Sequence, residues 1–181
     1  ISAMGKSTNA LEEIADFFFT GNQVELNKSF DKFKNFHISI MKDLFDGPEH
    51  SSFQKVNEVF EKMHLKISGK VSLNYDFDYD QIVSFGEILS TLIVSEYLIE
   101  LGIKAEWMDI RESLRTDNKY REAKVDWQNS EILMKQNFLF ENKDILVTQG
   151  FLGSTVNNLT TTLGREGSDY TAAIIAFVLE A

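Results

Sequence analysis

The stretch Thr160-Thr-Thr-Leu-Gly-Arg-Glu-Gly-Ser-Asp-Tyr-Thr-Ala-Ala173 runs from a polar, glycine-punctuated loop directly into a small-residue helix that we expect to begin near Ser168. A helix start leaves backbone N–H groups unpaired and carries partial positive charge, so the backbone itself can bind a phosphate or carboxylate there. Gly164 and Gly167 let the backbone approach a ligand closely, Arg165 offers a planar guanidinium fork, and Asp169 adds a carboxylate. The stretch therefore predicts a loop-to-helix junction that binds an anion.

Two short apolar segments before this junction are typical of strands. They are Ala105-Glu-Trp-Met-Asp109 and Asp144-Ile-Leu-Val-Thr-Gln149, and helical stretches separate them. This order predicts a three-layer α/β/α sandwich with a mostly parallel central sheet, in which ligands gather at the carboxyl ends of the strands. Asp109 and the Gln149-Gly150-Phe151 segment stand at such ends.

Apolar residues at helical spacing predict four helices in the first part of the chain. Their expected ranges are Thr8–Phe19, Val24–Phe45, Ser52–Leu65 and Tyr79–Leu101, the last ended by Gly102. We interpret residues 24–75 as a phenylalanine-rich helical insertion. It either packs on the core, which we favour, or forms part of a subunit contact.

Composition limits the classes of function. The 181 residues suffice for one domain, 43% of them are hydrophobic, and the net charge is −10 with the basic residues scattered. That charge pattern argues against a nucleic-acid partner and against an anionic membrane surface. The chain has no cysteine and three widely spaced histidines, so we predict no resident metal site. We expect no membrane-spanning run and a cytoplasmic protein.

The segment Gly5-Lys6-Ser7-Thr8 matches half of a phosphate-binding P-loop. The first glycine of that motif would fall before Ile1, and no later strand supplies the expected magnesium-binding aspartate. We favour the interpretation that this segment is a strand-to-helix turn bordering a small-molecule site.

Glu87 and its neighbour Gly86 lie within the fourth predicted helix, where glycine costs on the order of 1 kcal/mol relative to alanine. Close packing of another segment would explain Gly86. Glu87 would bind a ligand ammonium group, or it is a solvated or structurally paired glutamate.

Other acidic residues have simpler interpretations. Asp109 and Asp117 line a pocket or cap the segment that follows them, and capping is the default. The alternation of Asp76, Asp78 and Asp80 is similar to a calcium loop but lacks its glycine and its distal glutamate.

Several of these segments together resemble aspartate kinases of the amino-acid-kinase superfamily. The resemblance lies in Ser2-Ala-Met-Gly-Lys-Ser-Thr-Asn9, Ser84-Phe-Gly-Glu87, Trp107-Met-Asp-Ile-Arg111, Thr148-Gln-Gly-Phe151 and Thr161-Thr-Leu-Gly-Arg-Glu-Gly-Ser-Asp-Tyr170. It covers nearly the whole chain apart from about residues 24–75. The resemblance implies ATP-dependent phosphorylation of the side-chain carboxylate of L-aspartate, the first step of lysine, threonine and methionine synthesis, with Mg²⁺ carried by ATP.

The resemblance also implies residue roles. Arg165 would bind a substrate carboxylate and Glu87 its ammonium group, while Thr8, Phe151 and Ser168 would line the aspartate pocket. Asp169 would organise the phosphoryl-transfer centre, and Gly164 and Gly167 would border the nucleotide. Glu166 stands where many relatives have glycine.

The chain also departs from the pattern of the resembling family. A Lys-Phe-Gly-Gly-Thr-Ser segment, a later nucleotide-binding stretch and ACT regulatory domains are absent from residues 1–181, which we therefore expect to form one partial catalytic domain, inactive alone, of a protein that is homo-oligomeric at full length. Two alternatives stay open: a kinase of the same fold for glutamate, a nucleotide monophosphate or carbamate, and a catalytically silent amino-acid-binding module.

Overall fold

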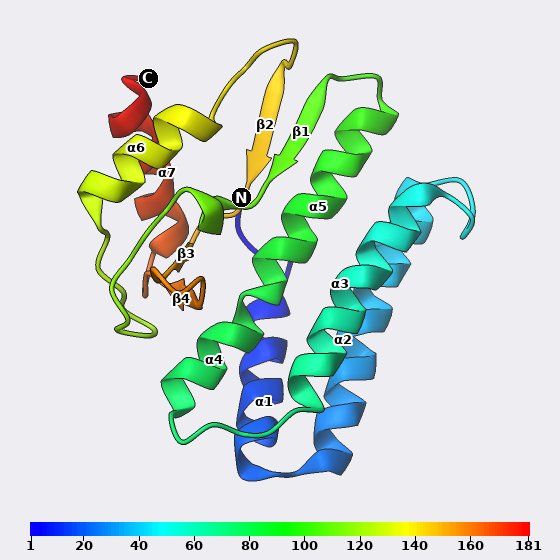
Figure 1. The fold of residues 1–181 in the computed structure, drawn as a ribbon. Coiled ribbons are helices and arrows are strands. Elements are labelled where there is room, and N and C mark those ends of the chain that lie inside the picture. Colours follow the sequence, from blue (N-terminus) through cyan, green and yellow to red (C-terminus); the bar gives the residue numbers. More distant parts are fainter.

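The computed structural model describes all 181 residues as a helical half and an α/β half (Figure 1). The helical half contains α1 (Ser7–Thr20), α2 (Gln23–Leu44), α3 (Ser51–Ile67), α4 (Tyr75–Val83) and α5 (Phe85–Glu100). The other half contains β1 (Ala105–Met108), η1 (Ile110–Glu112), α6 (Trp127–Asn137), β2 (Ile145–Thr148), β3 (Leu152–Ser154), β4 (Thr160–Thr162) and α7 (Gly167–Leu179). The four predicted helical regions and both predicted strands are present.

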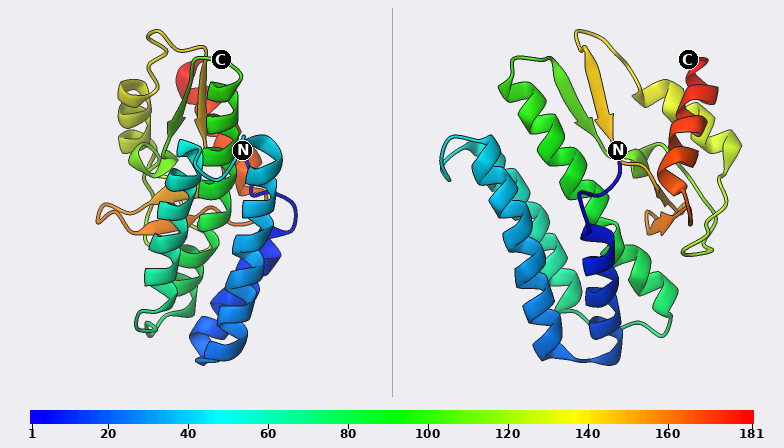
Figure 2. Two further views of the ribbon diagram at one scale, coloured as in Figure 1. Left: turned by 90° about the vertical axis from the view of Figure 1, so that its right-hand side faces the viewer. Right: turned by 180° about the vertical axis from the view of Figure 1, so that it is seen from behind.

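The predicted mostly parallel central sheet is correct only in part. β1 and β2 are parallel, with Trp107 opposite Val147, but β3 and β4 form a separate antiparallel pair with Gly153 opposite Thr161. Seen along the edge of the β1–β2 pair, α5 and α6 lie on opposite faces of it (Figure 2). A layered α/β/α arrangement is therefore present around two strands rather than around a wide sheet. β3 (Leu-Gly-Ser) and β4 (Thr-Thr-Thr) were not predicted, because such short strands carry little apolar pattern. The helix α6 was not predicted either.

The fourth predicted helix is two helices joined at Ser84. α4 begins at Tyr75, four residues earlier than we expected, because the Asn74 side chain caps it by accepting a hydrogen bond from the backbone N–H of Phe77. Together α4 and α5 are long and apolar enough to cross a membrane by length and composition, contrary to our expectation. Their most apolar 18-residue window is 72% buried, as befits the central helix of a core.

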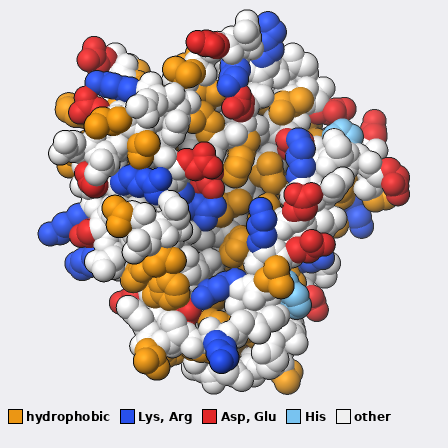
Figure 3. Space-filling model, in the orientation of Figure 1, with side chains coloured by type: hydrophobic (Ala, Val, Ile, Leu, Met, Phe, Trp, Pro, Cys, Tyr) orange, Lys and Arg blue, Asp and Glu red, His pale blue; other side chains and the backbone are white.

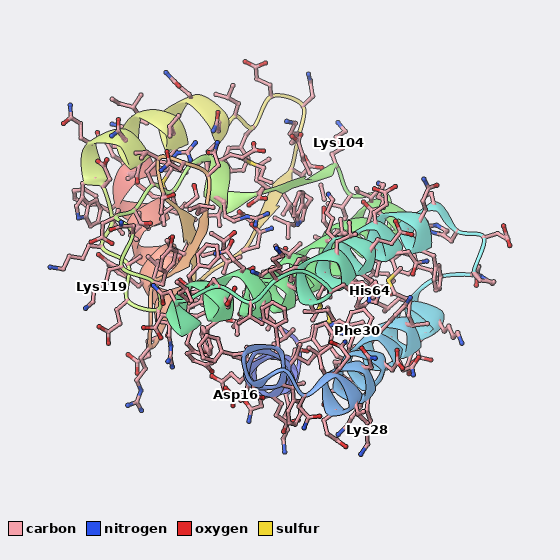
Figure 4. All side chains as sticks on the ribbon, turned by 60° about the horizontal axis from the view of Figure 1, so that its bottom comes forward. Asp16, Lys28, Phe30, His64, Lys104 and Lys119 are labelled. Atoms are coloured by element: carbon pink, nitrogen blue, oxygen red, sulfur yellow. The ribbon has the colours of Figure 1, made fainter.

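One hydrophobic core joins the two halves. Its 29 buried residues run from Leu11 in α1 to Val178 in α7. The helical insertion belongs to this core, since Phe33 and Phe60 are buried in it, and Figure 4 shows Phe30 and His64 meeting between α2 and α3. This agrees with the core-packing interpretation of residues 24–75. On the face shown in Figure 3, basic and acidic side chains are interspersed.

Candidate functional site

A cavity of about 300 Å³ lies where the N-terminal segment, α5, the β2–β3 connection and the start of α7 converge. Its lining includes seven of the eight residues that the sequence analysis assigned to a site. The residues that line it are Ser2, Thr8, Glu87, Phe151, Gly164, Glu166, Gly167, Ser168 and Asp169. Segments separated by more than a hundred residues in the chain therefore meet at one point.

The segment before α1 is anchored beside the end of β2. Ile1 donates from its terminal amine to the Thr148 carbonyl at 3.0 Å, and Gly150 N–H donates to the Ile1 carbonyl at 2.9 Å. Gly5 then adopts a positive φ of 55°, which turns the chain into α1 and brings Thr8 to the cavity.

The P-loop interpretation of this turn does not fit the structure. Lys6 lines a different cavity, against Phe33 and Phe36. The buried Ser7 hydroxyl lies 3.4 Å from His37 Nε2, so it is used for packing α1 on α2. Only Thr8 of the four residues borders the candidate site. The turn leads into α1 as predicted, but no strand precedes it.

Glu87 is the most unusual side chain of the site. It is 4% exposed, one carboxylate oxygen accepts a hydrogen bond from Ala3 N–H at 3.3 Å, and the other oxygen has no partner. Burial raises the pKa of this carboxyl group to about 7, although nearby backbone N–H groups favour its ionised form. Neighbouring Gly86 is explained by packing, because a Cβ there would lie 3.0 Å from both Ala3 Cβ and Leu11 Cδ1.

The β2–β3 connection is held rigidly against α5 and α7. Gln149 is fully buried, accepts from Ile110 N–H and donates to Thr91 Oγ1. Phe151 follows with a positive φ of 68°, and its N–H donates to Thr171 Oγ1 of α7 at 2.9 Å. These contacts present the Phe151 ring at the cavity wall.

The start of α7 has the loop-to-helix geometry that the sequence of residues 160–173 predicted. The backbone N–H groups of Ser168 and Asp169 have no acceptor within the chain. Glu166, at the N-cap position, has a positive φ of 59° and no side-chain capping bond. Gly167 is required by close approach, because a Cβ there would lie 2.6 Å from Phe151 Cδ2. Unpaired amides at the start of a helix, in residues that line a cavity, are groups that can bind an anion.

Arg165 lies apart from the other predicted residues. It lines an adjoining cavity of about 780 Å³, which shares Phe151 and Gly164 with the first. The Arg165 side chain is exposed and forms no ion pair within the chain. Its guanidinium group is thus available at the boundary of the two cavities.

The remaining acidic candidates are structural. Asp109 caps η1 by accepting from Arg111 N–H and also pairs with the Arg111 guanidinium. Asp117 accepts from the N–H groups of Lys119 and Lys124, which closes a turn. The capping interpretation therefore fits both residues, and Asp117 also lines a separate cavity of about 520 Å³.

Asp76, Asp78 and Asp80 do not converge on one point. Asp76 pairs with the Arg121 side chain and Asp78 with Lys66. Asp80 instead accepts hydrogen bonds from β4. Neither the hydrogen-bond partners of Asp80 nor the position of the Asn118–Glu122 loop beside the larger cavity was predicted from the sequence. No local sequence pattern indicates contacts between segments so far apart in the chain.

The fold agrees with comparisons to known proteins. The model of the amino acid kinase family matches residues 2–181, and the chain belongs to this family. The relatives with curated names are aspartokinases: the chain is 31% identical to lysine-sensitive aspartokinase 3 of Escherichia coli and 28% identical to a chloroplastic bifunctional aspartokinase/homoserine dehydrogenase of Zea mays.

These relatives are longer than the present chain. The alignments cover all of the chain, but only 39% of the Escherichia coli protein and 20% of the maize protein. Among solved structures, Escherichia coli aspartokinase III in complex with aspartate and ADP matches with a TM-score of 0.86 over 99% of this chain and 39% of that chain. The aspartate kinase of Clostridium acetobutylicum matches with a TM-score of 0.76 at 25% identity.

Proposed function

We propose that the protein containing these residues is an aspartate kinase, which transfers the γ-phosphoryl group of ATP to the side-chain carboxylate of L-aspartate. One observation carries the proposal. The buried, half-paired carboxylate of Glu87 and the free amides of Ser168 and Asp169 line the same small cavity. The ammonium group of an amino acid pairs with the Glu87 carboxylate, and a carboxylate of the same amino acid binds the two amides.

The residues of the cavity supply binding and orientation. The unpaired Glu87 oxygen accepts a hydrogen bond from the substrate ammonium, and the charged pair compensates the burial of the carboxylate. Arg165 binds a substrate carboxylate from the adjoining cavity, the hydroxyl groups of Thr8 and Ser168 complete the polar wall, and Phe151 excludes water. A dicarboxylic amino acid satisfies all of these groups together.

Phosphoryl transfer requires alignment and neutralisation of charge more than covalent participation of the protein. A side-chain carboxylate oxygen of aspartate attacks the γ-phosphorus, the bond to the β,γ-bridging oxygen breaks, and ADP leaves. Free amides at the start of α7 stabilise negative charge at that end of the cavity, and Gly164 and Gly167 leave room for the phosphate chain. Asp169 lies beside these groups and helps to organise the transfer.

ATP and Mg²⁺ are the proposed cofactors. The Escherichia coli structure contains ADP as well as aspartate, which supports a nucleotide in the reaction of that relative. Mg²⁺ binds carboxylate and phosphate oxygens together with water. The exposed side chain of Asp169 is a carboxylate at the cavity, so it would hold a magnesium ion that arrives with the nucleotide and neutralises its phosphates.

The test is ADP release from ATP and Mg²⁺ by the full-length gene product, with L-aspartate, with L-glutamate and without an amino acid. We expect release only with aspartate, and trapping with hydroxylamine should give aspartyl hydroxamate. Stimulation by glutamate alone would keep the family and change the substrate. Absence of release under all conditions, together with measurable aspartate binding, would favour the amino-acid-binding module.

A further inference from the structure

The outer edge of β4 is paired with side chains of α4 instead of a third strand. Thr160 donates its N–H to Gln81 Oε1 at 3.3 Å, and its carbonyl accepts from Gln81 Nε2 at 2.7 Å. Gln81 thus satisfies both backbone groups of one strand residue, as a neighbouring strand would.

The preceding residue, Asp80, continues this pairing. It is 0% exposed, and its carboxylate accepts hydrogen bonds from Thr162 N–H at 2.9 Å and from the Thr162 hydroxyl at 2.8 Å. A third hydrogen bond comes from Arg121 N–H at 2.9 Å. A fully buried carboxylate is costly unless its donors are well placed, and here all three donors belong to residues that line the larger, adjoining cavity.

Both segments that Asp80 holds lead to the larger cavity. Thr162 is two residues before Gly164, where the turn that carries Arg165 begins, and all three line that cavity. Arg121 belongs to the Asn118–Glu122 loop, which lines the same cavity and packs directly against Gly164, and Figure 4 shows Lys119 of this loop near α4. Asp80 itself does not line the cavity.

We propose that Asp80 is a positioning residue of the substrate site, which fixes the Arg165 turn and the Asn118–Glu122 loop relative to each other. It acts through backbone N–H groups and does not touch the substrate. The part of this inference that concerns substrate rests on the proposed function. Its structural part, the ordering of the Arg165 turn, is independent of any activity.

The structure offers a matched control in the same helix. Asp78 is also 0% exposed and accepts three hydrogen bonds, from Lys66 Nζ, Ser72 N–H and the Ser72 hydroxyl. These partners lie at the end of α3 and in the connection to α4 and line neither cavity, although Ser72 is hydrogen-bonded to Asn74, which lines the larger one. Asp78→Asn therefore removes a comparable buried carboxylate without touching the site.

The experiment compares Asp80→Asn, Thr162→Val and Asp78→Asn in the full-length gene product. Asparagine replaces the charge-assisted hydrogen bonds of Asp80 with weaker neutral ones, so we expect the KM for aspartate to rise about tenfold with kcat within about threefold of wild type. Thr162→Val removes one of the three hydrogen bonds and should raise KM less. Asp78→Asn should lower thermal stability and leave KM unchanged.

Hydrogen exchange gives a readout that does not need activity. We expect backbone amides of residues 162–168 to exchange about tenfold faster in Asp80→Asn and at the wild-type rate in Asp78→Asn, which should instead loosen residues 68–74. Unchanged exchange of residues 162–168 in folded Asp80→Asn would overturn the inference, as would an equal rise of KM in both aspartate variants. If the wild type shows no aspartate-dependent ADP release, the proposed function fails while the exchange result still decides the role of Asp80.

Discussion

Glu87 shows how one buried side chain can indicate a ligand. Its carboxylate has one bonded oxygen and one oxygen without a donor, in a position that is almost closed to solvent. Such a group costs folding free energy, and that cost is offset only when a cation arrives. The nearby Glu96 is the opposite case, because Lys55 and Ser52 satisfy its buried carboxylate within the fold.

Replacing Glu87 with glutamine should separate binding from stability. Loss of a charged hydrogen bond to the ammonium group should weaken aspartate binding by about 10- to 100-fold, equivalent to roughly 1.5–3 kcal/mol. Calorimetric titration of Glu87→Gln measures this loss. The control Glu96→Gln should be less stable but bind aspartate as the wild type does, and equal losses in both variants would contradict a specific role for Glu87.

The raised pKa of Glu87 also predicts how the stability of the variant depends on pH. Because the carboxyl group has an ordinary value of 4.5 and titrates at about 7 in the fold, the folded state binds more protons between these values, so its contribution to stability is lost as pH rises through this window. Glutamine does not titrate. Urea unfolding should therefore find Glu87→Gln more stable than wild type at pH 8, by up to about 2–3 kcal/mol, and show a smaller gain at pH 5.

Glu166 has a strained backbone conformation and a negative charge, and two variants separate the effects of these two properties on stability and on ATP binding. Glycine is favoured at its φ of 59°, so Glu166→Gly should raise the free energy of unfolding by roughly 0.5–1 kcal/mol. Glu166→Gln retains the strain and removes the charge beside the proposed phosphate path. We expect both variants to lower the KM for ATP by about two- to fivefold through reduced repulsion, measured by steady-state kinetics. A change in Glu166→Gly alone would assign the effect to the backbone.

At the scale of elements, the contact between α1 and α2 positions the first wall of the site. His37 of α2 is fully buried among aromatic rings, its Nδ1 lies 2.9 Å from the Phe33 carbonyl, and its Nε2 faces the Ser7 hydroxyl. The carbonyl requires a proton on Nδ1, which leaves Nε2 as the acceptor for Ser7. Ser7 directly precedes Thr8, which lines the cavity. A neutral His37 therefore helps to position Thr8 through its contact with Ser7.

Acidification should weaken this contact. Burial lowers the pKa of His37 below 6.5, so the unfolded state binds the proton more readily, and the contribution of His37 to stability is present above about pH 6.5 and lost as pH falls. Glu87 and Asp80 have raised pKa values and change stability in the opposite direction over this range. The test is therefore the difference in unfolding free energy between wild type and His37→Gln, which should shrink from pH 7 to pH 5. A constant difference would show that His37 does not titrate there.

At the scale of the molecule, the helical and α/β halves share one core while the site lies at their junction. Ile1 to Thr8 passes between them, from the end of β2 to the start of α1 (Figure 1). The chain covers about two fifths of the Escherichia coli relative, so catalysis is a property to test on the whole gene product.

We expect residues 1–181 alone to unfold in a single cooperative transition, because one 29-residue core spans both halves. We also expect them to bind aspartate weakly at best and to form no aspartyl phosphate. Calorimetry and hydroxylamine trapping measure the two properties. ATP-dependent hydroxamate formation by residues 1–181 would show that these residues contain a sufficient catalytic apparatus.

The sequence by itself determined the elements with strong local patterns, and it identified seven of the residues that line the candidate site. Apolar spacing located α1, α2 and α3, and the glycine-rich approach to Ser168 located the start of α7, because helix periodicity and glycine are local signals. Tertiary structure decided what depends on distant partners: the break of the fourth helix at Ser84, the separate antiparallel pair, the unpaired Glu87 oxygen and the attachment of Asp80 to β4. A carboxylate has the same chemistry at any position in a sequence. Only the groups packed around it in the folded protein determine whether it caps a turn, positions a strand or is left unpaired in a cavity.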